Sequence, residues 1–248
     1  MISLSTKYKA ASWSLSLLSR FVRYTLGPMK ILQSRVKEPF PHPYKTISIK
    51  PKEIKYFGGC YNRKPYKHGG NFSLAYWSGA EVKKGDWDKN LSKIEDMEKY
   101  TAIKLRFQED KEWSETGIYE YIEKKIEESN DPAGYDGCKS RDDIRKRYHK
   151  IDRLYKNIRD EGYKKSNHLD EVCVNIGRNG EVIFNGQGKH RLSIAKILGL
   201  EYIPVRILVR HHRWQRLREH VSQASHYKDL NEKAKANLTH PDLNDVAP

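Results

Sequence analysis

The chain has 248 residues, of which 37% are hydrophobic, 11% aromatic and 32% charged, and its formal net charge is +15 at pH 7. This length allows one large domain or a small domain with additions, and the apolar fraction is sufficient for a buried core. No stretch approaches the roughly 18 apolar residues of a membrane span. The 3 cysteines show no paired metal spacing. We therefore expect a cytoplasmic protein without disulfides.

Residues 1–70 are strongly basic and are interpreted as an arm followed by a loop region. The first 67 residues contain 14 Lys and Arg but only two acidic residues, Glu38 and Glu53. Three roles for this arm are compatible with its composition: a helix packed on the protein's own core, a contact with nucleic acid or an anionic membrane surface, or a targeting segment. Near its end, Ile47 to Ile49 are predicted to form a strand, and the glycine-rich stretch around Cys60 a loop.

The next region, 71–138, is predicted to be helical. Apolar residues recur at helical spacing from about Asn90 to Phe107 and again over 118–126, with charged residues mostly on the opposite face. A Gly-Asp-Trp-Asp sequence precedes the first helix, and its Asp86 and Asp88 either mark the helix start or hold a metal ion. We favour the helix start, and we assign no metal site.

From residue 139 to 222 the pattern changes to strands that alternate with helices. Val172, Val174 and Ile176 alternate with polar residues, as in a half-buried strand, and Asn179-Gly180 is a typical hairpin turn. The predicted order is a helix around 151–158, strands over 172–176 and 181–184, a helix over 189–199 and a strand over 205–209. The three strands are expected to share one sheet.

The turn before the 189–199 helix has a composition suited to binding phosphate. Gly186 and Gly188 allow close approach of the backbone to a ligand, and Lys189, His190 and Arg191 open the helix. A helix start presents unpaired N–H groups and a partial positive charge, which attract anions. These five residues are the candidate nucleotide- or phosphate-binding site. The alternative is a tight strand-to-helix turn whose basic residues are solvated.

These motifs, in this order, resemble the N-terminal ParB domain of the ParB/sulfiredoxin-like superfamily, over roughly residues 141–210. The family's phrases are a helix end, a strand and hairpin, a Gly-Glu-Arg-Arg type box and a Gly-Leu-x-x-Ile-Pro-Val segment. Their counterparts here are Asn157 to Gly162, Val172 to Ile176, Gly188-Lys189-His190-Arg191 and Gly199 to Val205.

In ParB relatives the box binds nucleotide phosphates, and CTP hydrolysis is known in the family. The resemblance therefore implies a nucleotide partner, with a nucleoside triphosphate and Mg²⁺ as the cofactor pair, held by the box. The later arginine of the family's box falls on Ser193, so one phosphate contact is missing. Sulfiredoxins place a nucleophilic cysteine where this chain has Lys189, so thiol redox chemistry is not expected. Cys60 lies in a different context and is interpreted as a loop residue.

After the last strand, a basic helix is expected from about Arg210 to Val221. Arg210, Arg213 and Arg216 are weak candidates for contacts with nucleic-acid phosphates, although a docked terminal helix explains the same pattern. The arginines are expected to point away from the apolar face. Residues 223–248 form a polar tail that we expect to be frayed. The 38 residues after Arg210 are too few for a helix-turn-helix DNA reader plus a dimerisation element, so sequence-specific DNA recognition is not expected.

Together these patterns predict an α/β (α+β) fold with a helix-rich N-terminal half and a C-terminal ParB-like mixed sheet. The predicted function is binding of nucleotide or nucleic-acid phosphates through the Gly-Lys-His-Arg box. One alternative is an enzyme of the same superfamily (an NTPase, nuclease or small-molecule kinase), for which Glu161, Asp170 and Glu171 are the nearest carboxylates in sequence. Another is a non-catalytic interaction module. The sequence assigns no catalytic residue and no oligomeric state.

Overall fold

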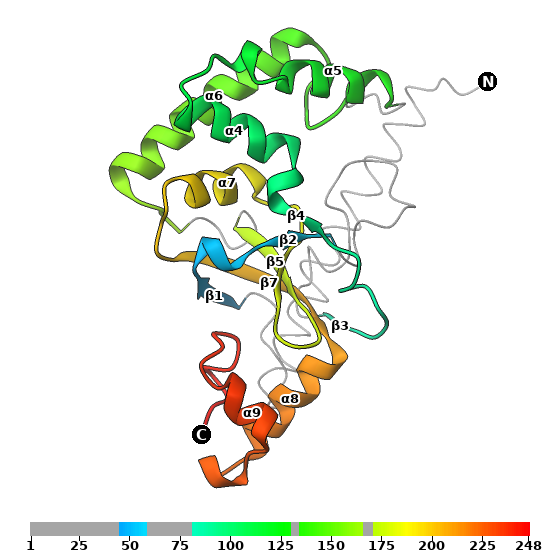
Figure 1. Ribbon diagram of the computed structural model, residues 1–248, viewed down its shortest axis with the longest axis vertical. Helices are drawn as coiled ribbons and strands as arrows, with labels where there is room; N and C mark the ends of the chain where they lie inside the picture. Colours follow the sequence, from blue (N-terminus) through cyan, green and yellow to red (C-terminus); the bar gives the residue numbers. More distant parts are fainter. Residues whose placement is uncertain (1–44, 59–80, 130–133, 166–170) are drawn as a thin grey trace, which may run out of the picture.

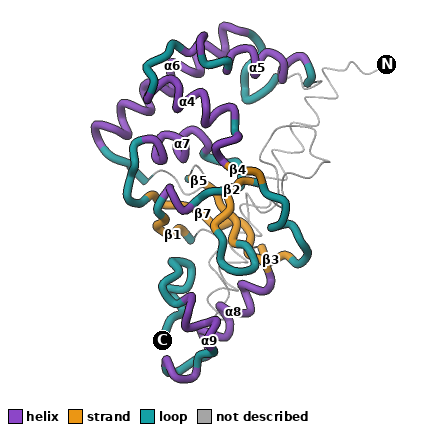
Figure 2. The backbone as a smooth tube through the Cα atoms, in the orientation of Figure 1, coloured by secondary structure: helices purple, strands orange, loops and turns teal. Residues whose placement is uncertain are grey.

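The computed structural model describes residues 45–58, 81–129, 134–165 and 171–248 (Figure 1). Most of the expected N-terminal arm, and Cys60, lie outside these ranges. Figure 2 shows the strands gathered between two groups of helices, with α4 to α7 at one end of the molecule and α8 and α9 at the other. The α-helices of the described residues are α4 (Glu98–Gln108), α5 (Ile118–Glu127), α6 (Arg141–Glu161), α7 (Lys189–Ile197), α8 (His212–Gln223) and α9 (Glu232–Asn237).

One mixed sheet runs through the described part of the chain. Its strands are β1 (Thr46–Ile49), β2 (Tyr56–Phe57), β3 (Glu81–Lys83), β4 (Ser92–Lys93), β5 (Val172–Ile176), β6 (Val182–Phe184) and β7 (Ile203–His211). They follow the order β1-β7-β5-β6-β2-β4, and β3 also pairs with β7. The mixture of helices and strands confirms the α+β class. The sheet takes strands from three of the four regions expected from the sequence.

The predicted hairpin and its neighbouring strand are confirmed. β5 pairs antiparallel with β6 and parallel with β7, so the three predicted strands share one sheet. β5 differs from the prediction in one respect, because all five of its residues are buried. Val172, Val174 and Ile176 face the main core, while Cys173 on the opposite face packs among residues that include Trp87 and Leu208. A strand covered on both faces therefore replaces the expected half-buried one.

The helical end of the molecule has its own apolar core. Apolar side chains of α4, α5 and α6 pack together with Ile194 of α7. α6 begins at Arg141, capped by the Ser140 side chain, which accepts a hydrogen bond from the backbone N–H of Asp143. The first predicted helix begins later than expected. Residues 92–93 instead form β4, which pairs with β2, and a short 3₁₀ turn, η3 (Ile94–Asp96), leads into α4.

The C-terminal segment is folded, and the expectation of a frayed tail is wrong. Leu230, Ala234 and Leu243 are buried in the main core. Asp242 is fully buried as well, where it meets Arg210 of β7. The prediction failed because this ion pair joins residues 32 positions apart in the chain. The hydropathy of the tail does not reveal such a pair. No helix in the described residues is long and apolar enough to cross a membrane.

Candidate functional site

The turn between β6 and α7 needs its second glycine for structural reasons. Gly188 has a φ of +80°, and a Cβ at this position would lie 2.8 Å from the Cα of Val172. Gly186 has a φ of +112°, but a Cβ there would meet open space within 4 Å. The neighbouring Gln187 carbonyl accepts a hydrogen bond from the Cys173 N–H at 3.1 Å. The strand β5 therefore holds the turn, which accounts for part of the glycine pattern without any ligand.

Lys189, the first residue of α7, lies in a cluster of charged side chains from three other places in the chain. Lys99 of α4 donates a short hydrogen bond to the Asp136 carboxylate, and the Arg147 Nη2 of α6 lies 3.1 Å from the same carboxylate. The ammonium groups of Lys189 and Lys99 are close enough to interact. Three basic groups thus share one carboxylate, so positive charge exceeds negative charge among these four side chains.

The pKa values in this cluster reflect that excess. Burial, and next the charge of Lys189, lower the pKa of Lys99 to about 7. Burial opposes ionisation of Asp136, but Lys99 and Lys189 outweigh it and lower its pKa to about 2. The Lys99 side chain is only 6% exposed. A buried ammonium beside a second ammonium is costly, so this position favours an additional anion.

His190 lies close enough to interact with the charged cluster, beside the Tyr148 ring, but it does not add charge. Its ring lies 6.2 Å from the Tyr148 ring, centroid to centroid. Burial lowers the pKa of His190 to about 3, so the imidazole is neutral near pH 7. Its Nε2 is buried and has no hydrogen-bond partner among the described residues. A buried polar atom of this kind requires a partner to offset its loss of solvation.

Arg191 points to a different place from Lys189 and His190. It interacts with the Tyr163 hydroxyl, which in turn donates a hydrogen bond to Glu171 at 3.4 Å. Arg191 lines a cavity of about 320 Å³ at the end of α6. The lining residues are Leu154, Asn157, Ile158, Glu161, Gly162, Tyr163, Lys164 and Arg191. The three basic side chains of the box therefore do not surround one hollow, because Arg191 lies apart from Lys189 and His190.

The carboxylates considered for an enzyme reaction lie near this second cavity. Glu161 lines it and pairs with Lys164, and Glu171 is fully buried beside Tyr163. Asp170 lies outside the described residues. Because Asp136 is the carboxylate next to Lys189, the sequence-based candidates Glu161 and Glu171 are grouped with Arg191 rather than with the start of α7.

The three arginines suggested for nucleic-acid contact differ in their exposure to solvent. Arg213 and Arg216 are exposed on α8. Arg210 is fully buried, and its Nε and Nη2 donate hydrogen bonds of 2.8 and 2.6 Å to Asp242. The assignment of Arg210 to nucleic acid is therefore wrong. Arg218, which was expected to point outward, is buried too and pairs with Asp245.

The Gly-Asp-Trp-Asp sequence does not form the expected helix start. Asp88 accepts hydrogen bonds from the backbone N–H of Arg178 at 2.7 Å and from the Arg178 guanidinium, and Asp86 accepts a further one at 2.6 Å. Through these hydrogen bonds to Arg178, the two carboxylates stabilise the hairpin that joins β5 to β6. Trp87 packs beneath them with Cys173 and Leu208. The described residues contain no cluster of three or more metal-ligating side chains.

Sequence reasoning missed Lys99, because the charged residues of the helices expected over 90–107 and 118–126 were assigned to solvated faces. It also missed Asp136 and Arg147, which lie outside both of those expected helices. A signal was present for Lys99, which shares a helical face with the buried Ala102 and Ile103. A lysine at the end of an apolar stripe is a candidate buried charge. Comparison of the chain with protein-family models, curated proteins and solved structures gave no match in any of the three.

Proposed function

We propose that this chain binds the phosphate group of a nucleotide or nucleic acid at the N-terminus of α7. The observation that carries the proposal is the group formed by Lys99, Lys189 and Arg147 around a single carboxylate, Asp136. An anion placed there would offset the uncompensated positive charge. It would also meet the unpaired N–H groups and the positive end of the helix dipole.

His190 gives independent support, because its buried Nε2 has no partner in the described residues. A phosphate oxygen is a suitable acceptor when this nitrogen carries the proton. Gly186 leaves the approach to the turn open, since a Cβ there would meet nothing within 4 Å. We assign Lys189 as the principal phosphate ligand and Arg191 to the neighbouring cavity.

We also propose that the chain is a member of the ParB/sulfiredoxin-like superfamily. The support is the order of elements around the box: α6, β5, a hairpin to β6, α7 and then β7. Under this assignment the ligand is a nucleoside triphosphate with Mg²⁺. The enzyme alternative, hydrolysis of that nucleotide or of a phosphodiester, is a separate proposal.

Calorimetric titration of the full chain with CTP, ATP and GTP, each with and without Mg²⁺, tests the proposal. Lys189→Gln is expected to weaken binding by tenfold or more, because a charge-assisted hydrogen bond contributes about 1.5–3 kcal/mol. Lys104→Gln is the matched control, since Lys104 is an exposed lysine of α4. Inorganic phosphate release in the same samples separates hydrolysis from binding alone.

Absence of binding at millimolar nucleotide, or equal affinities for Lys189→Gln and the wild type, would contradict the proposal. Thermal unfolding of the variant without ligand provides the folding control. A ligand at about 100 times its Kd adds about 2.7 kcal/mol to the free energy of unfolding. A folded variant that lacks this increment identifies a lost ligand contact rather than a lost fold.

A further inference from the structure

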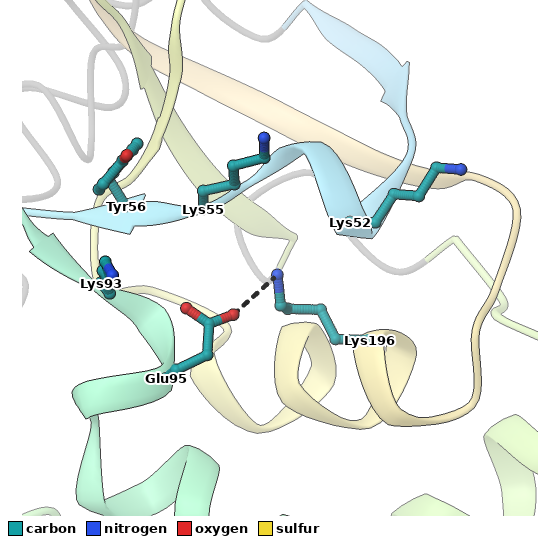
Figure 3. A pocket seen from close by; sticks show the side chains of 6 residues that line it. All are labelled: Lys52, Lys55, Tyr56, Lys93, Glu95 and Lys196. Carbon is teal, nitrogen blue, oxygen red and sulfur yellow. Dashed lines mark ion pairs between the residues drawn. The ribbon is translucent and has the colours of Figure 1, made fainter.

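A second basic site lies at the opposite end of α7 (Figure 3). It is a pocket of about 310 Å³ between α7, η3 and the segment that joins η2 (Pro51–Glu53) to β2. Its lining residues are Lys52, Lys55, Tyr56, Lys93, Glu95 and Lys196. Four ammonium groups therefore accompany one carboxylate. None of these side chains belongs to the site proposed at Lys189.

Lys196 is the ordered cation of the pocket. Its Nζ donates a hydrogen bond of 2.8 Å to the Ile54 carbonyl and one of 3.4 Å to the Pro51 carbonyl. Its side chain is 8% exposed, and its Nζ lies 3.8 Å from Glu95 (Figure 3). Burial lowers the pKa of Lys196, and the nearby charge of Lys55 lowers it further, while Glu95 opposes both. Glu95 is thus the one carboxylate among the residues that line this pocket, against four lysines.

The remaining lysines are exposed and long, so they can turn toward a bound anion. Lys52 belongs to η2, Lys55 directly precedes β2 and Lys93 belongs to β4, and all three side chains are exposed. In Figure 3 the side chains of Lys52 and Lys55 extend away from the ion pair between Lys196 and Glu95. A flexible ammonium of this kind contacts phosphate as a point charge, without fixed geometry.

An exposed aromatic ring accompanies these charges. Tyr56 lines the pocket and is 39% exposed. Lysines around an exposed aromatic ring are typical of surfaces that bind single strands, where phosphates meet cations and bases stack on rings. A small anion alone would leave the Tyr56 ring without a stacking partner.

We propose that this pocket binds single-stranded nucleic acid. Lys52, Lys55 and Lys93 would contact successive phosphates, and Tyr56 would stack on a base. Lys196 would supply a fixed positive charge at the base of the pocket. The proposal stands apart from the one at Lys189, because the two sites share no side chain.

Fluorescence anisotropy of a labelled 12-nucleotide thymidine strand with the full chain, at several salt concentrations, tests this proposal. The triple variant Lys52→Gln/Lys55→Gln/Lys93→Gln is expected to bind at least tenfold more weakly at low salt. Its log–log salt slope is expected to fall by about 2, since each phosphate contact to a single strand contributes about 0.7. The matched control is Lys150→Gln/Lys156→Gln/Lys228→Gln, which removes the same charge from exposed positions elsewhere.

The Tyr56 variants test the stacking half of the proposal. Tyr56→Phe is expected to keep the wild-type affinity, and Tyr56→Ser to lose fivefold or more. Equal losses in the two triple variants would overturn the proposal in favour of general charge attraction. Full competition by inorganic pyrophosphate at matched ionic strength would overturn it in favour of a small anion. Absence of strand binding by the wild type would overturn it outright.

Discussion

Replacement of Asp242 by alanine is expected to be the most destabilising single change at the C-terminal end of the molecule. The Asp242 carboxylate is fully buried and accepts two hydrogen bonds from Arg210 and one of 3.0 Å from the Trp214 Nε1. Arg210 is buried as well. The substitution removes the counter-charge and leaves a guanidinium inside the protein without a carboxylate partner.

The expected cost follows from that burial. Removing one partner of a buried ion pair typically lowers the free energy of unfolding by about 3–5 kcal/mol. In a domain of this size, that loss corresponds to a decrease in Tm of about 6–20 °C. Asp245→Ala provides the comparison, because Asp245 pairs with Arg218 but its side chain is 45% exposed. Its effect is expected to be well below that of Asp242→Ala.

Urea denaturation followed by circular dichroism measures both variants. The pH dependence gives a second readout. Burial alone would raise the pKa of Asp242, but Arg210 outweighs it and holds this pKa well below the usual range. The stabilisation from Asp242 is therefore fully present above about pH 4, and it is lost as the pH falls toward the pKa of the folded state. A loss under 1 kcal/mol for Asp242→Ala would refute the reasoning and indicate that the tail is not docked.

Two further predictions concern the α7 site. Gly188→Ala is expected to lower the free energy of unfolding by about 2–4 kcal/mol, because it adds a backbone clash with Val172 to the strain of a positive φ. Gly162→Ala is the control and should cost only about 1–2 kcal/mol, since Gly162 has a φ of +77° but a Cβ there would meet nothing within 4 Å. Denaturant titration of both variants checks this. Nucleotide affinity is expected to fall by up to tenfold per pH unit from pH 7 to 9, because Lys99, with its pKa of about 7, loses its charge over this range. Calorimetric titration of Lys99→Met should show an affinity that does not change with pH. A pH dependence equal to that of the wild type would exclude Lys99 as the titrating group.

The sheet around the box was predictable because short-range patterns determine it. Alternation in β5, the Asn179-Gly180 turn and the glycines before α7 each indicate a local backbone conformation, and the structure contains all three. These signals concern neighbours in sequence. For that reason they located the start of α7 but not the charged groups that surround it.

The rest depended on contacts between distant residues. Asp88 accepts a hydrogen bond from Arg178, 90 positions away in the chain. Because this partner is not visible in the local sequence, Asp88 was interpreted as part of a helix start. Arg210 and Asp242 each look like surface residues by composition, and only their pairing explains why both are buried. Charges that neutralise each other across the fold carry no periodic signal in the sequence, whereas apolar stripes do.

The central strand β7 has a consequence for how the chain acquires its structure during synthesis. β1 and β3 pair along β7, and β5 also pairs with it, although all three precede it in the sequence. β1 can pair with β7 only after Arg206, the partner of Thr46, has emerged from the ribosome. Until then β1 and β3 have no partner strand among the described residues, while helices of local sequence and the pairings β2–β4 and β5–β6 can already form. Completion of the sheet therefore comes only after β7 has been made.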